Sequence, residues 1–273
     1  MGAMFEHTFM QHAALAGLCA GISCGLMGVF VVIMHLSMLG ICIAHAAFAG
    51  AMLGILLGFE PLWGALVFSL AAAAFVGPLA DRGQLNPDSA VGIVFSFMLG
   101  LAFLFVGLTP GAKTHALSLF WGSILTVSTT DLAYLAAVTA LIVVLLVLFF
   151  KEIQAVVCHR RVAFAVGIPA TVVFYGLLFA TGATVAVSLR TVGGLLIYSL
   201  LLNPAAAAFQ LTFSLKWMFF LAAAFGVFSC WLGLAGSYFW DLPTGASIVI
   251  ASSLLFAAAL AVSPKRRMTT WRR

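Results

Sequence analysis

The chain has 273 residues, of which 64% are hydrophobic and only 7% are charged. A soluble domain carries about 25% charged residues, so this composition excludes a soluble globular protein. The formal net charge of +5 does not indicate nucleic-acid binding, because basic residues in a membrane protein mark the cytoplasmic side.

Apolar runs recur along the chain, and a run of about 20 residues crosses about 30 Å of hydrocarbon as a helix. We therefore predict an all-α, polytopic membrane bundle of about eight or nine transmembrane helices, with residues 1–273 forming a single domain. The nine predicted spans are 11–33, 39–58, 62–80, 90–108, 130–150, 169–187, 192–212, 216–238 and 244–263. Residues 117–128 are predicted as a partial or interfacial helix, and residues 181–195 as a broken or re-entrant segment.

Charge predicts the orientation of these spans. Residues 1–10 contain no Lys or Arg, so the first span is predicted to be retained rather than cleaved as a signal. Alternating spans place ten of the twelve basic residues on the side of the C-terminal tail, 264–273. Only Lys113 and Arg190 fall on the other side, so the tail is predicted to be cytoplasmic. Arg190 is interpreted as a snorkelling anchor or as a charge at an outer gate.

One polar insertion separates two spans. The segment KEIQAVVCHRRVAFAVGIP (151–169) mixes apolar and basic residues and predicts a short amphipathic helix at the cytoplasmic surface. Such a helix either binds anionic membrane lipid or docks a cytoplasmic partner, and the pattern alone leaves both interpretations open.

Six stretches, taken in order, resemble one family. They are FMQHAALAGLCAGISCGLMGVFVV (9–32), GIVFSFMLGLA (92–102), LFWGSILTVSTTDL (119–132), AVGIPATVVFYGLL (165–178), SLRTVGGLLIYSLLLNPAAAA (188–208) and GSYFWDLPTGASIVI (236–250). Together they make the chain resemble the membrane permease subunit of the manganese/zinc/iron-type ABC importers, an importer permease of the metal-chelate type in the bacterial cytoplasmic (inner) membrane.

The resemblance implies partners and a mechanism. Two copies of the chain would form the pore, and an extracytoplasmic binding protein would deliver the substrate. Two cytoplasmic ATPase subunits would hold ATP-Mg and dock on a coupling helix at about 151–168, and their ATP hydrolysis would drive alternating access. The residues expected at that contact are His159, Arg160, Arg161, Ala163 and Gly167. The chain itself is expected to be no enzyme and to bind no cofactor, and it contains no Gly-x-x-x-x-Gly-Lys-Ser/Thr run.

The second span of that family usually reads Gly-Asp-x-x-x-His, which places the carboxylate and the imidazole on one helix face. Here the stretch is GICIAHAAFAG (40–50), so His45 is kept and Ile41 replaces the acidic residue. All seven acidic residues of the chain fall at or near the ends of predicted spans. No carboxylate in the middle of a span is expected to replace the missing one.

Three residues are candidate metal ligands: His45, Cys42 and Met38. With Met34 they form a stripe at helical spacing, whose imidazole, thiol and thioether groups favour zinc over manganese. Simple packing of the Met and Cys side chains is the alternative. Ile41, Phe48 and Asn203 are predicted to line the pore, although Asn203 equally suits a plain bond between helices.

Two functions follow from this pattern. The first is inward transport of a divalent transition metal, with zinc ahead of manganese or iron. The second keeps the scaffold and moves a chelated metal or a small organic solute, which needs no carboxylate. A membrane enzyme or a stand-alone channel is the least favoured class, because the Ser and His residues show no nucleophile–base pairing. The basic residues of the coupling segment predict an ATPase with an acidic cleft.

Overall fold

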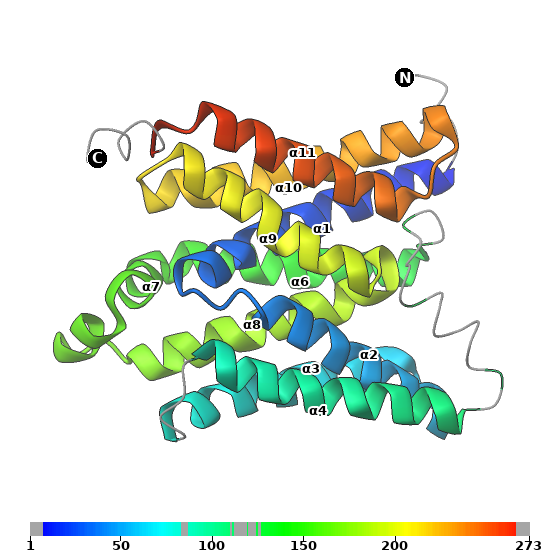
Figure 1. Ribbon diagram of the computed structural model, residues 1–273, viewed down its shortest axis with the longest axis horizontal. Helices are drawn as coiled ribbons and strands as arrows, with labels where there is room; N and C mark the ends of the chain where they lie inside the picture. Colours follow the sequence, from blue (N-terminus) through cyan, green and yellow to red (C-terminus); the bar gives the residue numbers. More distant parts are fainter. Residues whose placement is uncertain are drawn as a thin grey trace.

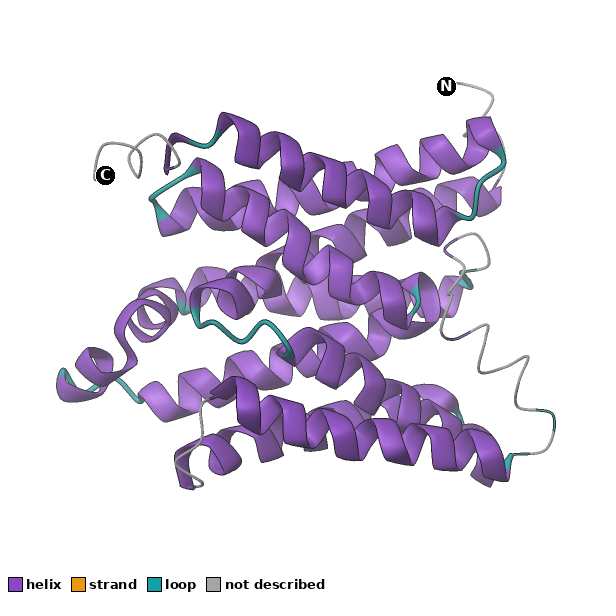
Figure 2. Ribbon diagram, in the orientation of Figure 1, coloured by secondary structure: helices purple, strands orange, loops and turns teal. Residues whose placement is uncertain are grey.

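The computed structural model describes residues 8–82, 87–109, 111, 119, 124 and 127–265. Within these residues the regular elements are helices, drawn in purple in Figure 2. They are α1 (Thr8–Ile33), α2 (Leu39–Leu57), α3 (Pro61–Arg82), α4 (Pro87–Leu108), α6 (Thr129–Leu148), α7 (Phe150–Ala165), α8 (Ala170–Val192), α9 (Gly194–Leu211), α10 (Leu215–Trp240) and α11 (Thr244–Val262).

Eight of these helices are long and apolar enough to cross a membrane, namely α1, α2, α3, α4, α6, α8, α10 and α11. The ninth predicted span corresponds to α9, whose apolar part, Leu196–Leu211, is shorter. In hydrocarbon each backbone polar group must find its partner within the protein, and a helix satisfies them within one segment. The predicted all-α, polytopic bundle is therefore confirmed, and the chain is a multi-pass membrane protein.

The region predicted to be broken or re-entrant, residues 181–195, is resolved into two helices. Helix α8 runs without interruption to Val192, and α9 begins at Gly194. Between them only Gly193 leaves the helical conformation, with φ 94° and ψ 148°. The predicted break is thus observed, and it is one glycine long, whereas the re-entrant alternative stays a prediction. The other irregular segment, 117–128, falls mostly outside the described residues.

Small residues set the closest approaches between helices. A Cβ atom added to Gly28 in α1 would lie 1.8 Å from the carbonyl oxygen of Leu201 in α9. Between α2 and α3, a Cβ atom on Gly50 would lie 2.0 Å from the carbonyl oxygen of Gly64. Membrane helices gain little from burying apolar surface against one another, since lipid is equally apolar, so they depend on such close packing.

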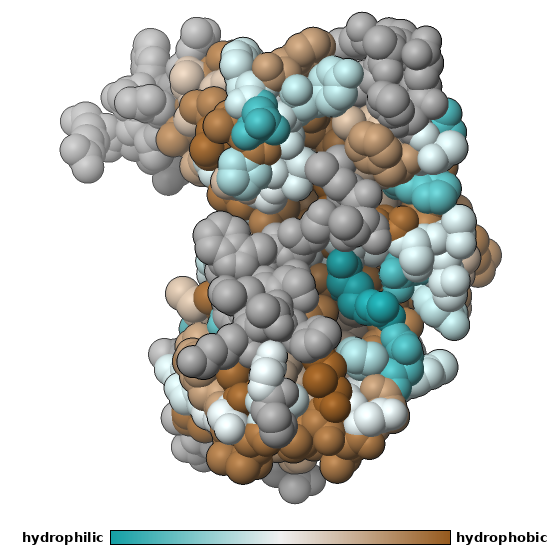
Figure 3. All heavy atoms as spheres, turned by 90° about the vertical axis from the view of Figure 1, so that its right-hand side faces the viewer, coloured by the Kyte–Doolittle hydropathy of each residue, from teal (hydrophilic) through white to brown (hydrophobic). Residues whose placement is uncertain are grey.

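The two ends of the bundle differ in charge. Figure 1 shows α7 and the C-terminus at one end and the N-terminus at the opposite end. The described basic residues at the α7 end are Lys151, Arg160, Arg161, Lys216 and Lys265, which matches the predicted cytoplasmic face. Figure 3 looks onto the opposite end, where hydrophilic side chains gather in the middle of the face. That end is the outer one in the predicted orientation.

Candidate functional site

Helix α2 carries the histidine that the sequence singles out. It begins at Leu39, after a turn in which His35 adopts a left-handed conformation with φ 55°. Most of α2 is buried, but Ile41 and His45 are partly exposed and lie one helical turn apart. The helix therefore presents a narrow accessible stripe on which the imidazole is the polar group.

The imidazole of His45 is held on two sides. Its Nδ1 lies 2.9 Å from the carbonyl oxygen of Ile41. Its ring meets the ring of Phe95 in α4 edge to face, with 5.1 Å between centroids. When Nδ1 carries the proton and donates to this carbonyl, the lone pair lies on Nε2, the form that ligates a metal. The two contacts thus fix the orientation of the imidazole ring.

A very small cavity adjoins His45. Its volume is about 10 Å³, and it is lined by Ala44, His45, Phe48 and Gly194. A single water needs about this much space, so the path beside the imidazole is nearly closed. Gly194 is the first residue of α9, which places the end of the α8–α9 break directly beside the histidine. Of the residues predicted to line the pore, Phe48 contacts this cavity.

The other two candidate ligands do not join His45 on the accessible stripe. Cys42 is fully buried in the core, with no exposed surface, whereas Met38 is 48% exposed at the start of α2. Within the described part of the chain, no group of three or more His, Cys, Asp or Glu side chains comes close enough to hold a metal. A metal site within one copy would thus rest on His45 alone, and the roles of Cys42 and Met38 stay predictions.

The described carboxylates follow the predicted distribution. Glu60, Asp88, Asp131, Glu152 and Asp241 all lie at or beside helix ends. Asp131, for example, is in the first turn of α6, where the Ser128 hydroxyl accepts a hydrogen bond from its backbone N–H at 3.1 Å. None of these five residues belongs to α2, so none of them supplies on that helix the carboxylate that is absent at Ile41.

Asn203 lies in the middle of α9 and bonds to α11. Its Nδ2 lies 3.0 Å from the hydroxyl oxygens of Ser199 and Ser252 and 3.1 Å from that of Ser253. Such a polar cluster joins two membrane helices, as in the interhelical alternative considered for Asn203. Its predicted pore-lining role stays a prediction, and the cluster accounts for the amide without it.

Arg190 forms an ion-pair cluster at the end of the bundle opposite α7, which is the predicted outer end. Its guanidinium group pairs with the Glu60 carboxylate at the start of α3 and lies 3.5 Å from the Asp131 carboxylate of α6. Arg190 also lies in the last turn of α8, where a cation favourably meets the negative end of the helix dipole. The cluster therefore connects three helices just outside the His45 region.

The coupling segment is formed by α7, which bends at His159, where φ is −150° and ψ is 79°. His159 and Arg161 are exposed, and so is Gly167, whose φ is 85°. Ala163, by contrast, is buried, and Arg160 turns back toward α8, where its guanidinium carbon lies 4.4 Å from the centroid of the Phe174 ring. The five residues expected to face an ATPase thus divide into an outward and an inward set.

Sequence reasoning missed several partners of these residues. Phe95 and Gly194 pack around His45, Phe174 lies under Arg160, and Glu60 pairs with Arg190. The available signal was the motif order, since 92–102 contains Phe95 and 188–208 contains Gly194. Nothing in the sequence says that these two stretches meet at α2.

Comparisons with known proteins identify the family and agree with the fold. A family model described as the ABC 3 transport family matches residues 6–263. The chain is 30% identical to the "Manganese transport system membrane protein MntC" of Halalkalibacterium halodurans, over 98% of this chain and 93% of that protein. It is 33% identical to the "Probable iron transport system membrane protein" of Haemophilus influenzae, over 96% of each. The solved structure "PsaBC from Streptococcus pneumoniae in complex with Fab" is similar over 100% of this chain and 98% of that chain, with 30% identity and a TM-score of 0.88.

Proposed function

Since the chain belongs to the ABC 3 transport family, we propose that it is the permease of an ATP-driven importer that moves a divalent transition metal ion inward. The observation that carries this proposal is the placement of His45. A membrane-buried histidine lies on the partly exposed stripe of α2, with its ring oriented by Ile41 and Phe95, beside a nearly closed cavity. Ionisable groups inside a membrane bundle mark substrate pathways.

The site is completed by a second copy of the chain. One copy offers a single imidazole on the accessible stripe, and one nitrogen ligand does not hold a cation. Two copies related by a two-fold axis would bring two His45 side chains to the pore. The ion would be captured briefly there and released inward when the ATPases change state. ATP-Mg is bound by those partner subunits, and an extracytoplasmic binding protein supplies the ion at the Arg190 end of the bundle.

The donor chemistry gives the order of candidate metals. Imidazole suits zinc and iron, whereas manganese prefers carboxylate and carbonyl oxygen. Without the carboxylate that Ile41 replaces, zinc remains the first candidate. The names of two relatives refer to manganese and iron, which are the second and third candidate metals. The absent negative charge also predicts weak, transient capture, because the charge of the ion is not neutralised.

A second cargo is favoured by one observation. The stripe beside His45 is otherwise apolar. Ile41 lies on it one turn before His45, and Phe48 lines the same cavity as the imidazole. A chelated metal or a small organic solute would be accommodated by such a lining without a carboxylate. The two cargoes differ in what they require of His45, because an apolar solute needs no ligand.

Uptake in vesicles tests the proposal. Vesicles that hold the chain and its ATPase should take up radioactive zinc, manganese or iron only with ATP and the binding protein. His45→Ala should abolish this uptake, and Cys42→Ala, at the buried position, tests separately the predicted ligand role of Cys42. Flux without ATP would exclude an importer. Uptake that survives His45→Ala unchanged would exclude the metal site, and transport of a chelate by the same variant would favour the second cargo.

A further inference from the structure

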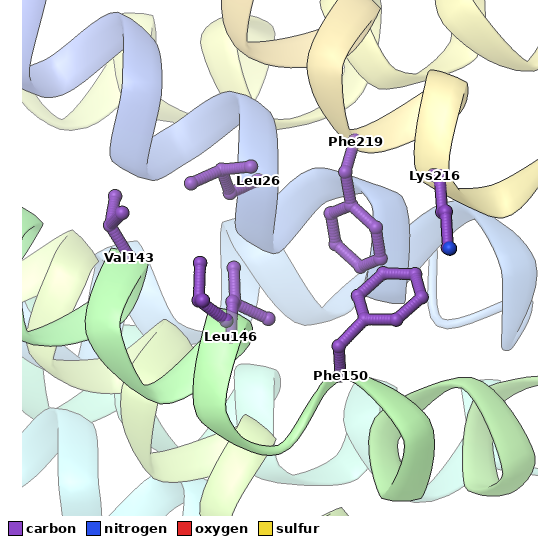
Figure 4. A pocket seen from close by; sticks show the side chains of 7 residues that line it. Leu26, Val143, Leu146, Phe150, Lys216 and Phe219 are labelled. Carbon is purple, nitrogen blue, oxygen red and sulfur yellow. The ribbon is translucent and has the colours of Figure 1, made fainter.

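A groove opens on the membrane-facing side of the bundle near its cytoplasmic end. It has a volume of about 370 Å³ and lies between α1, α6, the start of α7 and α10, as Figure 4 shows. Its lining residues are Leu26, Val143, Leu146, Val147, Phe150, Lys216 and Phe219. All but one of them are apolar, and Val147 is 72% exposed, so the groove is open to the surrounding bilayer.

The groove has a polar end and an apolar end. Lys216 is the second residue of α10, and its Nζ lies 5.8 Å from the centroid of the Phe150 ring. Phe150 meets Phe219 edge to face at 6.1 Å, and the two rings separate the lysine from the aliphatic part of the groove in Figure 4. Val143 lies about two helical turns before Phe150 in the chain, so it is about 10 Å deeper in the bilayer than Phe150, at about 1.5 Å per residue. The groove therefore runs from the membrane surface into the hydrocarbon.

The exposed side chain of Trp217 indicates how deep its neighbour Lys216 lies in the bilayer. Trp217 is 61% exposed, and exposed tryptophans concentrate at the headgroup level of the bilayer. Within the described part of the chain, no carboxylate forms an ion pair with Lys216, because both ion pairs found there belong to Arg190. The ammonium group is thus left at the height of lipid phosphates.

We propose that this groove is a binding site for an anionic phospholipid, with one acyl chain along Val143 and Leu146 and the phosphate at Lys216. A basic group at the cytoplasmic mouth of a cleft between membrane helices is the arrangement that binds anionic headgroups. A second copy of the chain is a poorer occupant. A second copy lying over this groove by two-fold symmetry would bring its own Lys216 to the contact, and the groove lining contains no carboxylate to pair with either lysine. This inference is independent of the transported cargo.

Native mass spectrometry of the purified full chain tests the headgroup contact. Dioleoyl-phosphatidylglycerol should bind about fivefold more tightly than dioleoyl-phosphatidylcholine, the factor that one lysine at a membrane surface supplies. Lys216→Gln should remove this preference. Lys151→Gln is the matched control, because Lys151 is exposed beside Phe150 but does not line the groove. Equal losses in both variants, or none in Lys216→Gln, would overturn the proposal.

A second pair of variants tests the acyl chain. Val143→Phe fills the deep end and should weaken both lipids to a similar extent. Val144→Phe, at the neighbouring position of α6 outside the groove, should weaken neither. Unchanged lipid binding in a folded Val143→Phe variant would contradict the site. Efficient disulfide cross-linking between two copies carrying Val147→Cys, in membranes, would show instead that a second copy covers the groove.

Discussion

The guanidinium group of Arg160 stacks on Phe174, with 4.4 Å between its central carbon and the ring centroid. Phe174 is almost fully buried in α8, and it meets Phe30 of α1 edge to face at 5.9 Å. A short chain of contacts therefore leads from the bend at His159 to the interior of two membrane helices. If α7 is the coupling segment, this chain of contacts is the route by which its movement would reach the bundle.

We expect Arg160→Ala to reduce the amount of metal taken up per ATP hydrolysed by several-fold, while hydrolysis by the partner ATPase continues. The stacking of an arginine on an aromatic ring contributes about 0.5–2 kcal/mol, and its loss frees the segment from α8. Arg161→Ala is the control, because Arg161 is exposed one residue away. Uptake and phosphate release, measured in the same vesicles, give the ratio. Identical ratios for both variants would show that Arg160 has no special part in coupling.

Gly28→Ala should destabilise the bundle. The added Cβ would lie 1.8 Å from the Leu201 carbonyl oxygen, so α1 and α9 must move apart, at a cost of roughly 1–3 kcal/mol. Gly92→Ala is the control. Gly92 also lies within a helix, α4, but a Cβ atom added there would have no neighbour within 4 Å. Alanine is the better helix former by about 1 kcal/mol, so the control should hold or gain stability. Thermal unfolding in detergent measures both, and equal melting temperatures would contradict the assigned contact.

Arg190→Gln should lower stability modestly and in a salt-dependent way. The pairs with Glu60 and Asp131 are partly exposed, and pairs of that kind contribute about 0–1 kcal/mol each. Salt at 1 M shortens the screening length to about 3 Å, so the difference between variant and parent should shrink. Lys151→Gln, at the other end of the bundle and exposed, controls for the lost charge. The melting temperatures of variant and parent at low and high salt measure this effect. A difference in melting temperature that is as large at 1 M salt as at low salt would mean that Arg190 stabilises the bundle by packing.

Ile41→Asp should change metal preference. A carboxylate one turn from His45 supplies the hard oxygen ligand that manganese prefers, so uptake of manganese should rise relative to zinc. The same charge costs about 2.5–3.5 kcal/mol at the centre of a membrane helix and less at Ile41, the third residue of α2, so stability without metal should fall modestly and partly recover when metal is added. Ile41→Asn, polar but uncharged, should give neither effect. Competition between the two metals in the vesicle assay measures the preference, and an unchanged ratio would place Ile41 away from the ion.

The helices could be predicted closely from the sequence. The predicted span 39–58 is observed as Leu39–Leu57, and 244–263 as Thr244–Val262, because long apolar runs allow few alternatives in a bilayer. The predicted family is confirmed as well. The candidate site was harder to predict, since helical spacing places Cys42 near His45 without saying which side of the helix is covered. That depends on α4 and α9, whose Phe95 and Gly194 come to α2 from distant parts of the chain.

Gly193 is a one-residue connection between two sets of helices. Helix α8 packs mainly against α3, whereas α9 packs mainly against α1, α10 and α11, and α2 contacts both of them; Figure 1 shows these helices. With φ 94° and ψ 148°, its backbone falls close to a region that glycine alone populates readily. The relative angle of α8 and α9 therefore depends on two dihedral angles at one residue. Position 193 lies between the Arg190 cluster and the cavity at His45, so its backbone conformation sets the direction in which the chain passes from one to the other.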